Sequence, residues 1–262
     1  IRVRQGIKGD SGTDAIGIAN GRNMIFDHIA VSWGRDETFS ISPSSGQTIS
    51  NITIQSSIIS QGLQGHSAGG LIQTMGGVSI LRNLYIDNDT RNPKVKFVNE
   101  FVNNVVCNWE TIGYNMGGDS AGDSYVNMFN NYFIRGPASG STAIGGGNAN
   151  FHIYAANNWL DGNRNGILDG TVLPIANYGP MDLQPAPYSY PVTPAAAYSP
   201  LTALKLVISD VGPSFRRDYV DELMIEELIS WGTKGGTITS ELLPPMNGPG
   251  VIRNGPPYPD AD

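Results

Sequence analysis

The chain has little charge and almost no cysteine. Only 15% of its 262 residues are charged, against about 25% in an average soluble protein. Its single cysteine, Cys107, excludes an internal disulfide, and the apolar surroundings VVCNW predict a buried, inert thiol. No zinc-ligand spacing and no Ser-His-Asp set is evident. The sequence therefore indicates neither a disulfide-bonded scaffold nor a zinc or serine hydrolase.

Long apolar runs are also missing. No stretch approaches the about 20 residues that cross a bilayer, and no signal peptide is present. The chain opens as IRVRQGIKGD without an initiator Met, so we expect a mature or truncated product, and the missing signal does not argue against secretion. The formal charge of −7 disfavours nucleic acid and anionic membrane as partners.

Short strands and turns fill residues 1–160. Apolar and polar residues alternate in segments such as IRVRQGI, ITIQSSIIS and VSILRNLYID, which is typical of half-buried strands. Glycine is abundant, with 33 residues, nearly twice the usual share of about 7%. We find no helical period in this part, so the sequence predicts an all-β architecture.

An asparagine before an apolar run recurs along these strands. It occurs at Asn51, Asn83, Asn103–Asn104, Asn130–Asn131 and Asn157–Asn158, at spacings of 32, 20, 27 and 27 residues. A period of about two dozen residues favours a solenoid, in which each coil adds one set of short strands. Asparagine tolerates the left-handed conformation at a corner, and stacked asparagines can bond along the solenoid as a ladder. The alternative is a sandwich in which these pairs mark ordinary loops.

The last hundred residues differ in composition. Residues 161–200 are rich in Gly, Pro, Asn and Tyr and predict an extended loop that wraps the body. A helix follows, with Asp218 as N-cap and Gly232 as its stop. Apolar residues such as Leu223 and Leu228 are expected on its packing face, and Asp221, Glu222, Glu226 and Glu227 on the other. Residues 234–262 predict a surface tail.

Three acidic residues near the start are candidate metal ligands. Asp14 precedes one predicted strand, and Asp36 and Glu37 precede the next. A spacing of 22 residues from Asp14 to Asp36 predicts equivalent places on adjacent coils, about 4.8 Å apart. Neighbouring carboxylates repel unless a cation lies among them, and oxygen ligands suit Ca²⁺ better than zinc. The alternative is that these residues only cap strand turns.

A basic cluster stands out in an acidic chain. Arg91, Lys94 and Lys96 lie within six residues at the start of a predicted strand. They are either a solvated strand edge, where lysine prevents aggregation, or a cationic wall that binds a carboxylate-bearing polyanion. His66, in the Gly-rich turn QGHSAGG, is a further candidate for substrate contact.

Four segments resemble the pectate lyases of polysaccharide lyase family 1. DAIGIANGRNMIFDHIAVSWGRDETFSI is similar to the family's Asp-Ala-Ile and Trp-Ile-Asp-His strands and the acidic segment after them. TRNPKVKF resembles its Arg-x-Pro-Arg-x-Arg segment, and VNEFVNNVVCNW the following strand. LKLVISDVGPSFRRDYVDELMIEEL resembles a tail segment of microbial members. Together these segments span most of residues 13–232.

The resemblance implies a right-handed parallel β-helix over residues 1–262 as a single domain. Its first coils are expected to be missing, and residues 161–262 to form a loop, short helices and a tail packed outside. The implied activity is Ca²⁺-dependent β-elimination on polygalacturonate by a secreted, extracellular protein, which we expect to be a monomer.

Residue roles carry over by position. Asp14 and Asp36 resemble calcium ligands, and Glu37 compensates for Ser40, where plant-like members have a second Asp. Arg91 resembles the arginine that removes the C5 proton. Lys94 and Lys96 are expected to bind substrate, with His66 in place of a family lysine.

Two alternatives remain at this point. One is a lyase for methylated pectin or another uronate polymer. The other is a non-catalytic β-helix that binds carbohydrate, in which replacing Arg91 leaves binding unchanged.

Overall fold

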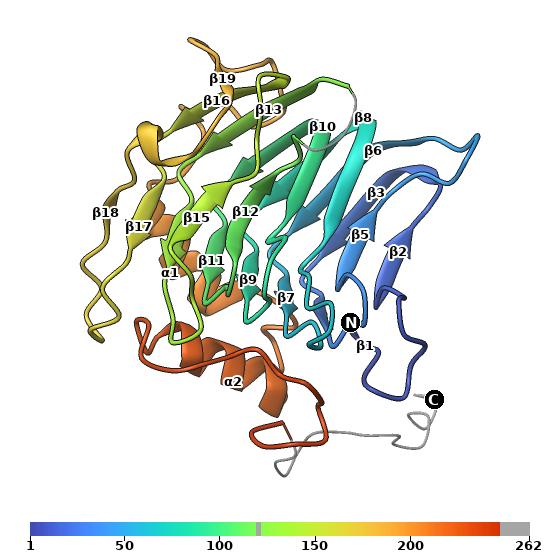
Figure 1. Cartoon of the computed structure of the whole chain (residues 1–262), viewed down its shortest axis with the longest axis vertical. Helices are drawn as coiled ribbons and strands as arrows, with labels where there is room; N and C mark the ends of the chain where they lie inside the picture. The colour runs from blue at the N-terminus through green and yellow to red at the C-terminus, as the bar shows by residue number, and fades with distance from the viewer. Residues whose placement is uncertain (119–121, 247–262) are drawn as a thin grey trace.

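The computed structural model describes residues 1–118 and 122–246. Parallel strands stack coil upon coil into a β-solenoid, with two short helices lying along one side (Figure 1). This confirms the parallel β-helix expected from the repeats. Each complete coil contributes strands to two sheets, and the second sheet bends into two halves.

The first sheet is built from three-residue strands that pair in parallel, with a short antiparallel strand at its end. Its strands are β1 (Arg2–Arg4), β4 (Ala30–Ser32), β7 (Ile58–Ser60), β9 (Leu84–Ile86), β11 (Val105–Cys107), β14 (Tyr132–Ile134), β17 (Trp159–Asp161) and the antiparallel β18 (Thr171–Val172).

The second sheet is bent, and two of its strands are long enough to run through the bend. β8 (Leu71–Leu81) and β10 (Lys94–Val102) run through both halves, with left-handed residues Gly77 and Phe97 at the bends. Its leading half comprises β2 (Ile16–Ile18), β5 (Phe39–Ile41), the starts of β8 and β10, β12 (Ile112–Met116) and β15 (Thr142–Gly145). Its trailing half comprises β3 (Gly21–Asp27), β6 (Ile49–Gln55), the ends of β8 and β10, β13 (Ser124–Phe129), β16 (Phe151–Ala156) and β19 (Asp182–Leu183).

The first sheet is buried on both faces. All three residues of β4, β7, β9, β11 and β14 are buried, since the inner face packs into the solenoid and the outer face meets the helices. Strands covered on both sides are expected to be continuously apolar, which explains runs such as the VVC of β11. Cys107 is buried there, as predicted.

The asparagine ladder forms, but with one different member. Asn83, Asn104, Asn131 and Asn158 follow the trailing half in successive coils. In each of the first three, the backbone N–H and the side-chain Nδ2 both donate to Oδ1 of the next asparagine, at 2.8 to 3.2 Å. Ser57 occupies the preceding rung through its own amide. Asn51, predicted to belong, pairs instead with Asn23 at an exposed position. In that coil the residue before the rung is the left-handed Ser56, at the place that Asn103, Asn130 and Asn157 take in later coils.

The helices α1 (Pro200–Asp210) and α2 (Tyr219–Leu228) pack against the outer face of the first sheet (Figure 1). Asp218 caps α2, as predicted. The predicted polar face is wrong in part, because Asp221 and Glu227 are buried. The cause for Asp221 is an ion pair with β1, since its carboxylate lies 2.7 Å from Arg2 and 3.0 Å from Arg4.

The segment between β17 and α1 runs along the trailing half. Side chains of the strands hold it, with Asn127 bonding both ways to the backbone of Tyr188 and Asn103 doing the same at Tyr198. This segment, which includes a 3-10 turn at Ile175–Asn177, agrees with the predicted wrapping loop. The predicted tail beyond residue 246 lies outside the described residues. No helix in the described chain is long and apolar enough to cross a membrane.

Candidate active site

The candidate site lies where the strands of the leading half begin. The pairing of Ile16 with Phe39 sets adjacent coils 23 residues apart, so Asp14 lies opposite Glu37. The backbone amide of Glu37 donates to Asp14 Oδ1 at 3.0 Å. The predicted alignment of Asp14 with Asp36 is therefore wrong by one residue, because the register, not the spacing of acidic residues, decides which side chains are level.

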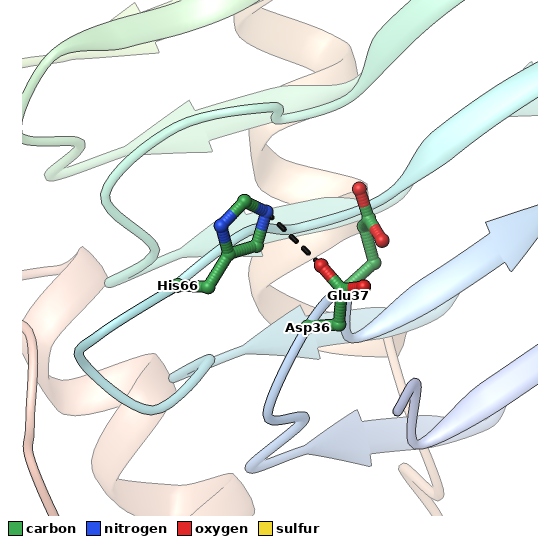
Figure 2. A group of neighbouring side chains, drawn as sticks. All are labelled: Asp36, Glu37 and His66. Atoms are coloured by element: carbon green, nitrogen blue, oxygen red, sulfur yellow. Dashed lines mark ion pairs between the residues drawn. The ribbon is translucent and has the colours of Figure 1, made fainter. Parts of the chain in front are cut away.

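The three acidic residues nevertheless form one cluster. Asp36 precedes Glu37 in the loop before β5, and its charge raises the pKa of both Asp14 and Glu37. Oxygens of Asp36 and Glu37 and a ring nitrogen of His66 all lie within 4.8 Å of one another. Figure 2 shows His66 reaching Asp36 from the loop before β8, with Nε2 and Oδ1 3.0 Å apart, while Glu37 lies behind.

Burial sets the electrostatics of this cluster. The Glu37 side chain is only 7% exposed, and this desolvation raises its pKa to about 7, against the opposing effect of Arg91. Desolvation likewise raises the pKa of Asp14. Carboxylates with raised pKa values bind an added cation favourably, because the cation removes their mutual repulsion.

Arg91 joins the cluster from two coils beyond Glu37. Its Nη1 donates to Glu37 Oε1, and the residue takes a left-handed conformation with φ of 55°. Its backbone amide donates to Asn115 Oδ1 of β12 at 2.8 Å. Such a conformation is unusual for a non-glycine residue and is a reason to examine a position for function.

The coil between Glu37 and Arg91 carries only small residues at positions 68–70. Ala68 bridges Glu37 on one side and Thr90 on the other, and Gly69 and Gly70 follow it. A Cβ at Gly69 would lie 2.6 Å from the carbonyl oxygen of Arg91, so a glycine is needed there. The small residues at 68–70 let the guanidinium cross to the carboxylate, and this signal was missed in the sequence.

The two lysines lie in the same coil as Arg91. Val95 between them is fully buried in the core, so strand alternation turns Lys94 and Lys96 outward. Lys94 is level with Leu71 and Asn115, and Lys96 with Gln73. The structure thus brings Asp14, Asp36, Glu37, His66 and Arg91 together and adds both lysines along the outer surface of β10.

The donor set fits calcium. Asp14, Asp36 and Glu37 offer carboxylate oxygens, the ligand type that Ca²⁺ takes. Burial is the first cause of the raised pKa values of Asp14 and Glu37, and a bound cation would relieve the repulsion that adds to them. His66 is the exception, because imidazole is more typical of zinc and copper sites.

Comparison with known structures agrees with this fold. The structure of the thermostable pectate lyase PL 47 superposes with a TM-score of 0.51, covering 79% of this chain and 56% of that one at 15% identity. At this identity the likeness shows the fold alone, and it places the chain among the parallel β-solenoids. No protein-family model matches the chain.

Curated proteins are similar to most or all of the chain. The chain is 54% identical over 264 residues to "Probable pectate lyase C" of Aspergillus fumigatus, and 54% identical over 266 residues to the protein of that name from Aspergillus terreus. Both alignments cover 100% of this chain and 61% of the relative. The Emericella nidulans protein is 55% identical over 92% of this chain and 56% of its own length. The chain is homologous to these proteins, and it spans about three fifths of their length.

Proposed function

We propose that this chain cleaves polygalacturonate by Ca²⁺-dependent β-elimination. The observation that carries the proposal is the contact of Arg91 with Glu37 inside a cluster of three carboxylates. The cluster offers oxygen ligands, and the basic residues beside it offer a surface for a polyanion. The relatives' names support the choice of pectate as the polymer.

Asp14, Asp36 and Glu37 are the residues that would hold calcium. When bound, calcium draws charge from a substrate carboxylate and makes the neighbouring C–H more acidic. The protein's own part is to fix these carboxylates through the register of β2 and β5.

We assign Arg91 as the base that removes the C5 proton. It accepts that proton, the C5–H electron pair forms the C4–C5 double bond, and the C4–O bond breaks with its electrons on the glycosidic oxygen. That oxygen takes a proton, which leaves an unsaturated uronide and a new chain end.

The charge on Arg91 has to be controlled for this role. A guanidinium has a pKa above about 12, and a negative Glu37 beside it favours its charged form. A neutral arginine therefore requires that the Glu37 charge be taken up elsewhere, by a proton or by a cation. The pKa of about 7 for Glu37 means that this carboxylate is not fully stabilised by Arg91 alone.

Lys94 and Lys96 are proposed to bind substrate carboxylates along β10, and His66 to contact substrate from the neighbouring loop. We also propose that the protein acts outside the cell, where plant cell-wall pectate is found, and as a monomer.

The test is an elimination assay with and without a chelator, on the parent and on Arg91→Ala. We expect absorbance of unsaturated uronides to grow for the parent only with calcium, and the rate for Arg91→Ala to fall by about 10²–10⁴, the usual contribution of a general base. Faster cleavage of methylated polymer would favour a pectin lyase. Equal binding by parent and variant, with no product from either, would favour a carbohydrate-binding role.

A further inference from the structure

A recess opens beside the carboxylate cluster, on the side away from Arg91. It encloses about 860 Å³, including its open mouth, and its lining includes Ser11, Gly12, Arg35, Gln64 and His66. Asp36 also lines it, so the recess is continuous with the cluster. We call it the Arg35 recess.

Arg35 is held in place by neutral groups. Its Nη1 donates to the carbonyl oxygens of Ile7 and Gly9, and its backbone amide bonds to Gln5 and Thr13. Across residues 1–118 and 122–246 its Nε and Nη2 donate no hydrogen bond and its guanidinium forms no ion pair. The side chain is therefore anchored by one nitrogen, while the rest of its planar donor set remains available.

The recess follows the order of the coils. Arg35 lies in the coil of β5, His66 in the next coil before β8, and Arg91 in the coil after that, before β10. Adjacent coils are about 4.8 Å apart, so the recess lies roughly two coil spacings from Arg91. A polymer that runs along the solenoid axis over Arg91 would place over the recess a sugar two places along from the one at Arg91.

We propose that Arg35 binds the carboxylate of a uronate residue that is separated from the cleaved bond by two other sugars. This inference rests on the proposed function, since it needs a polyuronate in the site. A guanidinium matches a carboxylate through two parallel N–H···O bonds, and the donors left by the backbone anchor suit that geometry. His66 Nε2 lies 3.0 Å from Asp36 Oδ1, so the carboxylate that lines the recess already has a partner.

The experiment compares Arg35→Gln with the parent on a galacturonate trimer, a galacturonate hexamer and polygalacturonate. We expect KM for the hexamer and the polymer to rise roughly tenfold or more, the effect of losing a charged hydrogen-bond pair, with kcat little changed. The trimer, too short to fill the recess while it is cleaved at Arg91, should show the same KM for both proteins. Arg35→Lys keeps the charge without the fork and should give an intermediate KM.

Arg22→Gln is the matched control, because Arg22 is an exposed arginine on β3 and its loss changes the net charge equally. Its KM should equal that of the parent at every length. If KM rises equally for all lengths and Tm is lowered, Arg35 only stabilises the loop at residues 5–13. If KM for the polymer is unchanged, the recess binds no sugar. If the parent cleaves the polymer but the Arg35 variants do not show the expected rise in KM, only the subsite proposal is wrong. If the parent does not cleave, the proposed function is wrong and the subsite with it.

Discussion

Glu37 accepts a hydrogen bond from the guanidinium of Arg91 across 54 residues of sequence. The two side chains start from different coils and meet over Ala68, which is fully buried and has no atom beyond Cβ. The same carboxylate is thus both a candidate calcium ligand and the partner of the candidate base. A change at Glu37 must therefore alter both metal binding and the state of Arg91.

Glu37→Gln tests this double role. The amide keeps a weak oxygen ligand but loses the charge, so we expect the calcium concentration for half-maximal elimination to rise about tenfold, equivalent to ~1.4 kcal/mol. A calcium titration of the elimination rate measures it. Glu226→Gln, an exposed change on α2, is the control and should leave the titration unchanged; an unaltered calcium requirement in Glu37→Gln would remove Glu37 from the metal site.

Asn115 is predicted to position Arg91. Its Oδ1 accepts from the Arg91 amide at 2.8 Å and from the Thr90 hydroxyl at 3.3 Å. Asn115→Ala leaves both donors without this partner and frees the left-handed turn, so we expect kcat to fall about tenfold with KM nearly unchanged, at a stability cost of ~1–3 kcal/mol. Asn115→Asp retains an acceptor and should recover most of kcat. If both variants lose only Tm, Asn115 supports the fold and does not position the arginine.

The solenoid could be predicted because its signals are local and repeated. A left-handed asparagine recurs at the corner, at Asn103, Asn130 and Asn157, and the next residue in each coil is a ladder asparagine that precedes a strand of the first sheet. The first coils broke that pattern, since Ser57 takes the rung and Asn51 lies elsewhere. A serine hydroxyl carries no periodic signal that distinguishes it from a loop residue.

The candidate site could be predicted by residue type but not by register. Asp14, Asp36 and Arg91 were all recognised, yet the partner level with Asp14 is Glu37. An offset of one residue depends on how each turn is closed, which strand patterns do not specify. Asn115 and Arg35 were missed for another reason, because their roles depend on contacts between coils that are distant in sequence.

The ladder makes a sharp stability prediction at Asn104. This fully buried side chain accepts from the backbone and side-chain nitrogens of Asn83 and donates to the Ile80 carbonyl. Asn104→Ala leaves these groups unsatisfied, at ~1–3 kcal/mol for each, so we expect severe loss of stability in thermal or urea unfolding. Asn51→Gly removes an asparagine pair at an exposed corner, where glycine accepts the left-handed φ of 55° without strain, and should change the unfolding free energy by less than about 0.5 kcal/mol. Similar losses in the two variants would contradict a stabilising ladder.

A pair of buried carboxyl groups predicts how stability depends on pH. Asp87, in the corner after β9, is fully buried and accepts a hydrogen bond from Asn108. Glu227 of α2 is 7% exposed and lies against it, and within residues 1–118 and 122–246 no N–H or hydroxyl group donates to Asp87 Oδ2 or Glu227 Oε2. Burial raises the pKa of Asp87 well above its ordinary value, and the charge of Glu227 adds to the effect. Burial also raises the pKa of Glu227, with Glu226 adding to the rise and Lys234 opposing it.

Asp87→Asn is therefore expected to reverse a loss of stability at high pH. In the unfolded chain the two carboxyl groups ionise at their ordinary pKa values of 3.8 and 4.5. In the folded chain their pKa values are raised, so they ionise only at higher pH. The free energy of unfolding therefore falls as pH rises from the unfolded to the folded pKa values. The amide keeps the acceptor for Asn108 and can donate to Glu227, so Tm of the variant should exceed that of the parent at alkaline pH, by about 2–4 °C for each kcal/mol recovered. Thermal unfolding across the pH range checks this, with the exposed Asp10→Asn as control. Parallel pH profiles for Asp87→Asn and the parent would show that the burial of Asp87 beside Glu227 does not cause the loss of stability at high pH.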